Sequence, residues 1–204
     1  MSSPAVRRIP GAHIADPGPL GLAAFALTTF VLSCVNANIV SGAAESAVFG
    51  LALAYGGIAQ FVAGLFEFAK GNTFGATAFC SYGAFWVAFW YLTGHTSPAP
   101  SGKGVGLFLL GFGIFTLYMT VATLRINGAL LAVFALLTIT FFLLAFGAMN
   151  GSTGLSKTGG WFGLATAIVA WYTSFAGVLA STFGKPVLPV FPLAGPTDPT
   201  DELT

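Results

Sequence analysis

Apolar residues dominate this chain in six long segments, and polar or helix-breaking residues gather between them. The segments cover residues 19–40, 46–69, 74–93, 104–124, 129–149 and 160–182. Each is close to the ~20 residues that cross a hydrocarbon core at a rise of about 1.5 Å per residue. The segments are apolar on all sides and lack the alternation of barrel strands, so the pattern predicts an all-α membrane protein with six transmembrane helices.

The same pattern divides the chain into three parts. Residues 1–18 form a polar, proline-containing N-terminal segment without the cleavage pattern of a signal peptide, and residues 19–182 form the transmembrane domain. Residues 183–204 form a proline-rich tail, which we expect to be an extended strap or disordered, with its acidic residues in solvent.

The distribution of charge predicts an orientation. Charged residues make up 6% of the chain, against about 25% in soluble domains, which places the protein in a lipid bilayer. Six spans and a cytoplasmic N-terminus put more cations inside (Arg7, Arg8, Lys70, Arg125, Lys185) than outside (Lys103, Lys157). This bias predicts cytoplasmic termini in a multi-pass protein of the plasma (inner) membrane. The lack of a basic run argues against a nucleic-acid partner.

One face of the second segment combines small and polar residues. Gly56, Gln60, Gly64 and Glu67 are spaced four, four and three residues apart, so they share a helical face. The glycines favour close helix packing, whereas an amide and a carboxylate in hydrocarbon usually point into a bundle or a wet cavity. Glu67 has an alternative interpretation, an interfacial ion pair with Lys70 three residues later.

Other segments also carry polar stripes. The first places Thr29, Ser33 and Asn36 on the face of Phe25, and the third places Thr77 and Ser81 beside Tyr82. Many Ser and Thr hydroxyls in membrane helices donate to a backbone carbonyl of their own helix, so one such residue alone is a weak indication of a substrate pathway. Together, and without a cation in mid-span, they predict weak coordination and rapid passage of a small anion or acid.

The chain offers little for other kinds of chemistry. Cys34 and Cys80 have no metal-like spacing, His13 and His95 lie outside the apolar segments, and no metalloprotease, hydrolase or phosphate-loop motif occurs. We therefore expect neither an enzyme nor a metal or other cofactor. Two alternatives to anion transport stay open: a channel for a small neutral solute such as ammonia, and a membrane scaffold or sensor that transports nothing.

Several motifs resemble those of the acetate/succinate uptake transporter family. They are DPGPLGL at 16–22, the stretch YGGIAQ to SYGAFW at 55–86 with KGNTFG inside it, FTLYM at 115–119, Leu137-Thr138, GWFGL at 160–164 and FGKPVLP at 183–189. The first motif departs from the family's NPAPLGL, because Asp16 stands for the usual Asn and Gly18 for the usual Ala. Asp16 keeps the side-chain acceptor of a helix N-cap and adds a negative charge at the expected mouth of the pathway.

The resemblance implies a pore in each of six identical protomers and a channel-like homohexamer. It also implies transport of acetate and, in some members of the family, of succinate, either passively or with protons. When the motifs are aligned, the family's narrow constriction falls on Phe25, Tyr82 and Leu137. The assignment of Leu137 rests on the resemblance alone. The resemblance also adds two sets of candidates. Pathway residues from the motifs are Asn72, Thr73 and Thr138, and the motif at the mouth comprises Asp16, Pro17, Gly18, Pro19, Leu20 and Gly21.

Overall fold

The computed structural model describes residues 14–193, and over this range the chain is almost entirely helical. The helices are α1 (Gly18–Asn36), the short η1 (Gly42–Ala44), α2 (Glu45–Leu53), η2 (Ala54–Ala59), α3 (Gln60–Lys70), α4 (Thr73–Gly94), α5 (Gly102–Thr123), α6 (Gly128–Asn150) and α7 (Thr153–Phe183). The expectations for residues 1–13 and for the acidic residues Asp198, Asp201 and Glu202 lie outside the described residues.

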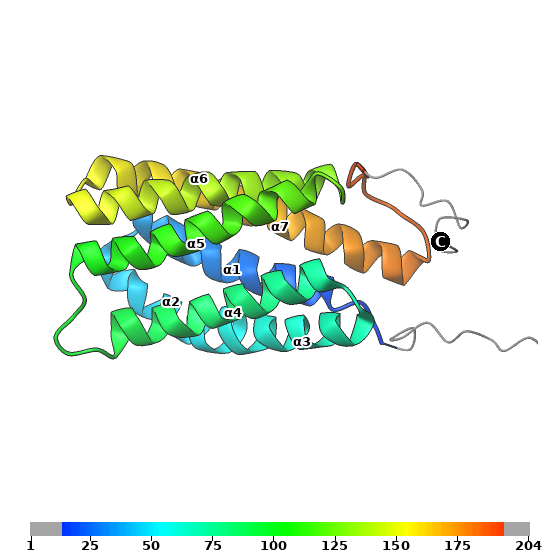
Figure 1. Ribbon diagram of the computed structural model, residues 1–204, viewed down its shortest axis with the longest axis horizontal. Coiled ribbons are helices and arrows are strands. Elements are labelled where there is room, and N and C mark those ends of the chain that lie inside the picture. The colour runs from blue at the N-terminus through cyan, green and yellow to red at the C-terminus, as the bar shows by residue number, and fades with distance from the viewer. Residues whose placement is uncertain (1–13, 194–204) are drawn as a thin grey trace, which may run out of the picture.

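The helices form an elongated bundle (Figure 1). The most extensive packing joins α5 to α6, α1 to α7, α6 to α7 and α3 to α4. The segments that lead into α1 and out of α7 lie at one end of the bundle, together with the α3–α4 turn and the α5–α6 turn (Figure 1). We call this the terminal end, and the end with the α4–α5 loop the far end.

Length and composition qualify five helical stretches to cross a membrane: 18–36, 42–70, 102–123, 128–150 and 153–183. The remaining long helix, α4, has 22 residues, which is also long enough to span. Its tyrosines, tryptophans and glycines give it a less apolar composition than its neighbours. Nine of its residues are buried inside the bundle, so α4 relies on protein contacts more than on lipid.

The second apolar segment is a continuous helix with a π-helical portion, η2, in its middle. Here Gly56 lies so close to α1 that an added Cβ would be 2.6 Å from Thr28 Oγ1. The wide turn ends at Gln60, the first residue of α3. Such π turns are often found at functional sites.

Local sequence explains how the helices begin and end. Asn72 Oδ1 accepts a hydrogen bond from the Gly75 N–H (3.1 Å) at the start of α4, and Asn127 Oδ1 accepts one from Leu130 (2.8 Å) at the start of α6. Gly71 ends α3 with φ +80°, which glycine adopts without the steric cost that a Cβ brings. These short turns keep consecutive helices antiparallel.

The chain after α7 folds back over the terminal end as a non-helical strap, residues 184–193. The N–H groups of Gly128 and Ala129 donate to the carbonyls of Phe191 (2.7 Å) and Val190 (3.2 Å). The strap therefore satisfies the backbone donors at the start of α6 that no intrahelical acceptor can reach.

Candidate functional site

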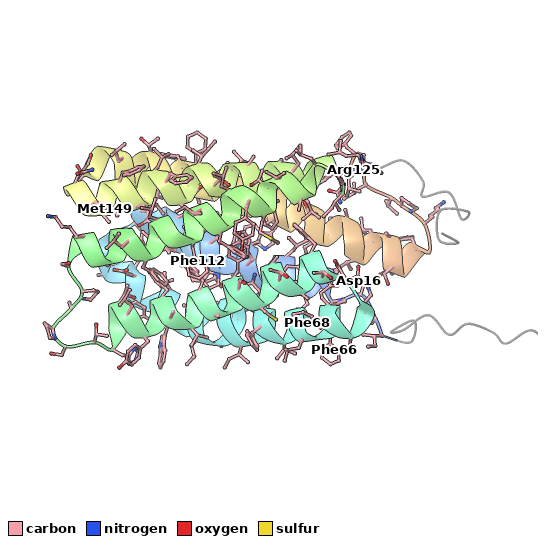
Figure 2. The ribbon with its side chains drawn as sticks, in the orientation of Figure 1. Asp16, Phe66, Phe68, Phe112, Arg125 and Met149 are labelled. Atoms are coloured by element: carbon pink, nitrogen blue, oxygen red, sulfur yellow. The ribbon has the colours of Figure 1, made fainter. Side chains whose placement is uncertain are left out.

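A cavity of about 330 Å³ opens into the terminal end of the bundle. Its walls come from five helices and the strap, so no single segment of sequence defines it. Figure 2 places Asp16, one of the lining residues, at this end. The helix residues that line it most deeply are Phe25 of α1, Gln60 of α3, Tyr82 of α4, Leu137 of α6 and Thr173 of α7.

These five residues lie at a common depth, which we call the floor. On α1 the lining runs from Gly18 to Phe25, a difference of seven positions. The same difference separates Glu67 from Gln60 on α3, and Gly75 from Tyr82 on α4. The pairs Leu130–Leu137 on α6 and Ala180–Thr173 on α7 repeat it. Seven residues rise about 10 Å along a helix, so the cavity reaches a common level about two turns inside the bundle.

The aromatic part of the floor is tightly packed. Phe25, Tyr82 and Leu137 are 5%, 3% and 4% exposed, and the rings of Phe25 and Tyr82 have centroids 5.8 Å apart. Tyr82 also packs edge-on against Phe115 at 5.4 Å. This part of the floor is therefore an apolar closure, to which α1, α4 and α6 each contribute one residue.

The Tyr82 hydroxyl is held by α5. Its oxygen lies 2.8 Å from Thr116 Oγ1, and Thr116 in turn donates to the carbonyl of Phe112 at 2.7 Å. Since the Thr116 proton is used in that second bond, the Tyr82 O–H is the donor to Thr116. The phenol is thus anchored to α5 by its hydroxyl.

The polar part of the floor differs, because Gln60 has free hydrogen-bonding capacity. The residue is 1% exposed, and neither its Nε2 nor its Oε1 has a hydrogen-bond partner. A buried amide without partners costs about 1–3 kcal/mol. An amide that lines a cavity can recover this free energy by binding a solute or water there.

Two hydrogen-bonded pairs surround the mouth of the cavity. Lys70 Nζ donates to Asp16 Oδ1 at 3.0 Å, and Asn72 Nδ2 donates to Glu67 Oε2 at 2.9 Å. Asp16 Oδ1 also accepts from the Gly18 N–H at 3.2 Å. The alternative expectation of a Glu67–Lys70 ion pair is wrong, because Lys70 reaches the segment before α1, whereas Glu67, 2% exposed, faces the cavity.

The structure brings together about half of the residues that the sequence singled out. The predicted residues that line the cavity are Asp16, Gly18, Pro19, Phe25, Gln60, Glu67, Asn72, Tyr82 and Leu137. Of the mouth motif, Pro17 and Gly21 are buried and Leu20 is 44% exposed. Gly21 packs against the ring of Phe79.

The remaining candidates lie elsewhere. Ser33 packs against Gly163 of α7, and Asn36 lines a separate hollow at the far end. Thr138 donates to the carbonyl of Phe134, Thr73 is exposed, and both Thr77 and Ser81 are half-buried. Thr29 is buried with its hydroxyl unpartnered.

Sequence reasoning missed one whole side of the cavity. Thr173, Ala176, Gly177 and Ala180 of α7 line it, as does Asn127 before α6. The strap contributes Pro186, Leu188 and Val190. The small residues at four-residue spacing on α7 could have indicated a face that packs against other helices. The contribution of the strap could not be foreseen in this way, because it depends on how the chain folds back.

The fold and the cavity define a class: a helical membrane protein with a solute-sized, mainly apolar chamber that ends at an apolar closure. Residues 1–195 match the GPR1/FUN34/yaaH family, and the chain belongs to this family. The match confirms the resemblance drawn from the motifs, because this is the acetate transporter family.

Several relatives are named as transport proteins. The chain is 40% identical over 182 residues to the succinate-acetate/proton symporter SatP of Escherichia coli K12, covering 87% of this chain and 95% of the relative. It is 40% identical over 200 residues to acetate permease A of Emericella nidulans, covering 86% of this chain and 65% of the relative. Ammonia transport outward protein 2 of Saccharomyces cerevisiae is 38% identical to it over 205 residues, covering 96% of this chain and 72% of the relative.

A solved structure agrees with the fold. The structure of the bacterial acetate channel SatP matches with a TM-score of 0.82 and 40% identity, covering 87% of this chain and 99% of that one. The relatives therefore support transport rather than catalysis, as the sequence predicted.

Proposed function

We propose that this protein transports acetate and related small carboxylates across a membrane through a pathway inside each protomer. The observation that carries the proposal is the cavity in a chain of this family, whose walls are apolar and whose floor combines an aromatic closure with the unpartnered Gln60 amide. Its volume, about 330 Å³, is at the small end of ligand pockets, which suits a small solute.

The pathway has a narrow point at Phe25, Tyr82 and Leu137, the constriction. A carboxylate that leaves the cavity through this point must shed hydration there, and apolar side chains offer no compensation. Gln60 at the same depth supplies amide donors without a full positive charge. Weak donors of this kind favour passage over retention.

The charges at the mouth bear on proton coupling. Glu67 lines the cavity and accepts its hydrogen bond from the neutral Asn72 side chain, whereas Lys70 is occupied by Asp16. A protonated Glu67, or a protonated acid as substrate, removes the repulsion between this carboxylate and an arriving anion. Protons are therefore a proposed second partner, and succinate a proposed second substrate.

The membrane arrangement is also part of the proposal. The helices α1, α2–α3, α4, α5, α6 and α7 form six spans, with the terminal end in the cytoplasm and the protein in the plasma (inner) membrane. Large apolar side chains face outward from the bundle, among them Phe66 and Phe68 of α3 (Figure 2). Such faces suit lipid or neighbouring protomers, and a homohexamer is the assembly we propose.

The decisive experiment is uptake of labelled acetate by proteoliposomes with the pH gradient and the voltage set independently. Acetate uptake that follows voltage indicates an anion channel, and uptake that follows the pH gradient indicates proton coupling or passage of the acid. Protein that passes no acetate in either condition would favour a scaffold or sensor.

A second candidate is a channel for a small neutral solute such as ammonia. One observation favours it: the floor of the cavity carries no charged side chain, and crossing it costs a neutral molecule far less than an ion. Ammonia flux that exceeds acetate flux in the same vesicles, with no dependence on voltage, would support this candidate.

A further inference from the structure

The two halves of the second membrane segment would face different directions if the whole segment were a regular α-helix. The buried residues of α2 are Val48 and Ala52, and those of α3 include Gln60 and Glu67. Gln60 follows Val48 by twelve positions. At about 3.6 residues per turn, twelve positions rotate by about three turns and a further 120°. In a regular helix, the Gln60 side chain would therefore point well away from the side that Val48 buries.

The π-helical portion η2 removes most of this difference. The Gln60 N–H donates to the carbonyl of Tyr55, which lies five positions back instead of the usual four. One extra residue in the wide turn takes up about 100°, because an α-helix rotates by that amount per residue. The directions of Val48 and Gln60 then differ by only about 20°. Gln60 consequently lies on the buried side of the segment, where it lines the cavity.

Gly57 is suited to η2 and to no side chain there. A Cβ on Gly57 would be 2.5 Å from the carbonyl oxygen of Ala52, five positions earlier in the same segment, and 2.8 Å from Val87 Cγ2 of α4. The oxygen belongs to the backbone, so only a change of the helical turn itself can relieve the first contact. A regular α-helix has no such conflict, since alanine is its most favourable residue. Glycine at position 57 therefore permits the π geometry.

Neighbouring helices hold η2 on both sides. A Cβ on Gly56 would be 2.6 Å from Thr28 Oγ1 of α1, and a Cβ on Gly83 of α4 would be 2.9 Å from the Gly57 carbonyl oxygen. Thr28 is fully buried, and its hydroxyl donates to the carbonyl of Ala24 at 2.9 Å, so its side chain is fixed. The wide turn is thus seated between α1 and α4, with no room for a different backbone path on either side.

We propose that η2 aims Gln60, and that Gly57, together with Gly56 packed against Thr28, are positioning residues for its amide. The inference rests on the proposed role of Gln60 in transport and adds the residues that set its direction. The Gln60 amide has no hydrogen-bond partner that could orient it, so its direction follows from the register of the helix. A regular helix of the same length would turn the amide about 100° away from the cavity.

One substitution and one deletion test the register. Gly57→Ala sets a Cβ against the Ala52 carbonyl, and Val87→Ala in the same protein removes the second contact; Val87→Ala alone is the control. Deletion of Ile58, which is 55% exposed, takes one residue out of η2, so that a regular helix then has the correct register. Deletion of Leu117, which is 50% exposed on the regular helix α5, is the control for the deletion.

The protein with Gly57→Ala and Val87→Ala should lose acetate flux at subsaturating concentration by about tenfold, the effect of one lost hydrogen bond to a charged group. Val87→Ala alone and deletion of Ile58 alone should keep most of the flux. Deletion of Leu117 should lower both the flux and the thermal midpoint, because α5 has no wide turn that can absorb the change.

Rescue is the result that a merely structural defect would not give. Deletion of Ile58 in the protein with Gly57→Ala and Val87→Ala should restore acetate flux. If that substituted protein does not assemble, the same deletion should restore the oligomer. Absence of rescue, or full flux in the substituted protein before the deletion, would overturn the proposal.

Thiol labelling separates this inference from the proposed function, because it requires no transport. In a protein whose two cysteines are replaced by alanine, a water-soluble methanethiosulfonate should modify Gln60→Cys and leave Ala59→Cys unmodified. Adding Gly57→Ala and Val87→Ala should exchange the two reactivities, since position 59 of a regular helix takes the direction that position 60 has beyond η2.

The two proposals can then fail independently. If the protein transports acetate and the reactivity stays at position 60 in the substituted protein, the positioning role of η2 fails and the proposed function stands. If the reactivity moves to position 59 while the unchanged protein passes no acetate, the proposed function fails and the positioning role stands.

Discussion

The Tyr82 hydroxyl donates a hydrogen bond to Thr116 Oγ1 across 2.8 Å, which ties the centre of α4 to the centre of α5. Both residues are buried, and the same two helices also pack through aromatic rings, Tyr82 against Phe115 and Phe85 against Phe108 and Phe112. The hydrogen bond and these ring contacts together fix the ring that closes the cavity. The hydrogen bond also means that a substitution at Thr116, a residue outside the cavity lining, acts on the constriction.

Replacing Thr116 with Val should destabilise the protein more than replacing Tyr82 with Phe. In Thr116→Val the Tyr82 hydroxyl stays buried without an acceptor, which costs about 1–3 kcal/mol. In Tyr82→Phe the Thr116 hydroxyl keeps its bond to Phe112, so the loss should be nearer 1 kcal/mol. Thermal unfolding in detergent measures both, and a larger loss in Tyr82→Phe would contradict the assigned direction of the bond.

Removing the charge of Glu67 should raise acetate flux at neutral pH. Glu67→Gln keeps an oxygen for the Asn72 side chain but removes a negative charge from the cavity wall. The charged groups that act on this carboxyl are Asp16, from the segment before α1, and Lys70 on α3. Flux measured with and without a pH gradient should also depend less on the gradient in the variant.

Glu45→Gln, in the first turn of α2 at the far end, is the matched control and should behave as the unchanged protein. A fall in acetate flux in Glu67→Gln, with the oligomer intact, would instead give the carboxylate a necessary role in its charged form.

Breaking the Asp16–Lys70 pair should change flux more than stability. Both side chains are partly exposed, and exposed ion pairs contribute only about 0–1 kcal/mol. Asp16→Asn frees the Lys70 charge at the mouth and should raise acetate uptake at low salt, whereas Lys70→Gln should lower it. Both effects should fade at higher salt, where the screening length falls to about 8 Å or less. Salt-independent changes would contradict this electrostatic origin.

Truncation after Gly184, which removes all of the strap except its first residue, should open the cavity and loosen the start of α6. The strap covers part of the cavity with Pro186, Leu188 and Val190 and accepts from the Gly128 and Ala129 N–H groups. We expect a lower thermal midpoint and faster flux of both acetate and acetamide. Tyr172→Phe, which removes only the bond to the Pro189 carbonyl, should show the same changes in weaker form. Slower flux after truncation would contradict a covering role.

The helices and their ends were largely predictable, because their causes are local. The predicted segment 74–93 corresponds to α4, Thr73–Gly94, and Asn72, directly before it, caps it. The predicted segment 46–69 covers most of α2 to α3, but its π-helical portion was not foreseen. That portion arises where Gly56 approaches α1, which is a contact between distant residues.

The site could be predicted only in part. The shared face of Gln60 and Glu67 follows from spacing along one helix, and both residues do line the cavity. Thr173 was missed, since nothing in the sequence of α7 alone says which of its faces packs against α1 and α6 around the cavity. The partner of Lys70 was also mistaken, because the acceptor is 54 positions away in sequence rather than three.

The sequence by itself determined that this chain forms long apolar helices suited to a bilayer, where most of those helices begin and end, and which family it resembles. The start of the last helix was missed, since α7 begins at Thr153 and the predicted segment began at 160. Composition, periodicity and turn residues act over a few positions, so one sequence suffices to read them. Only the tertiary structure decided which polar groups lack a partner. Thr28 and Thr29 are adjacent and chemically identical, yet one hydroxyl bonds to its own helix and the other does not. That difference depends on what the neighbouring helices place around each side chain, which no local pattern specifies.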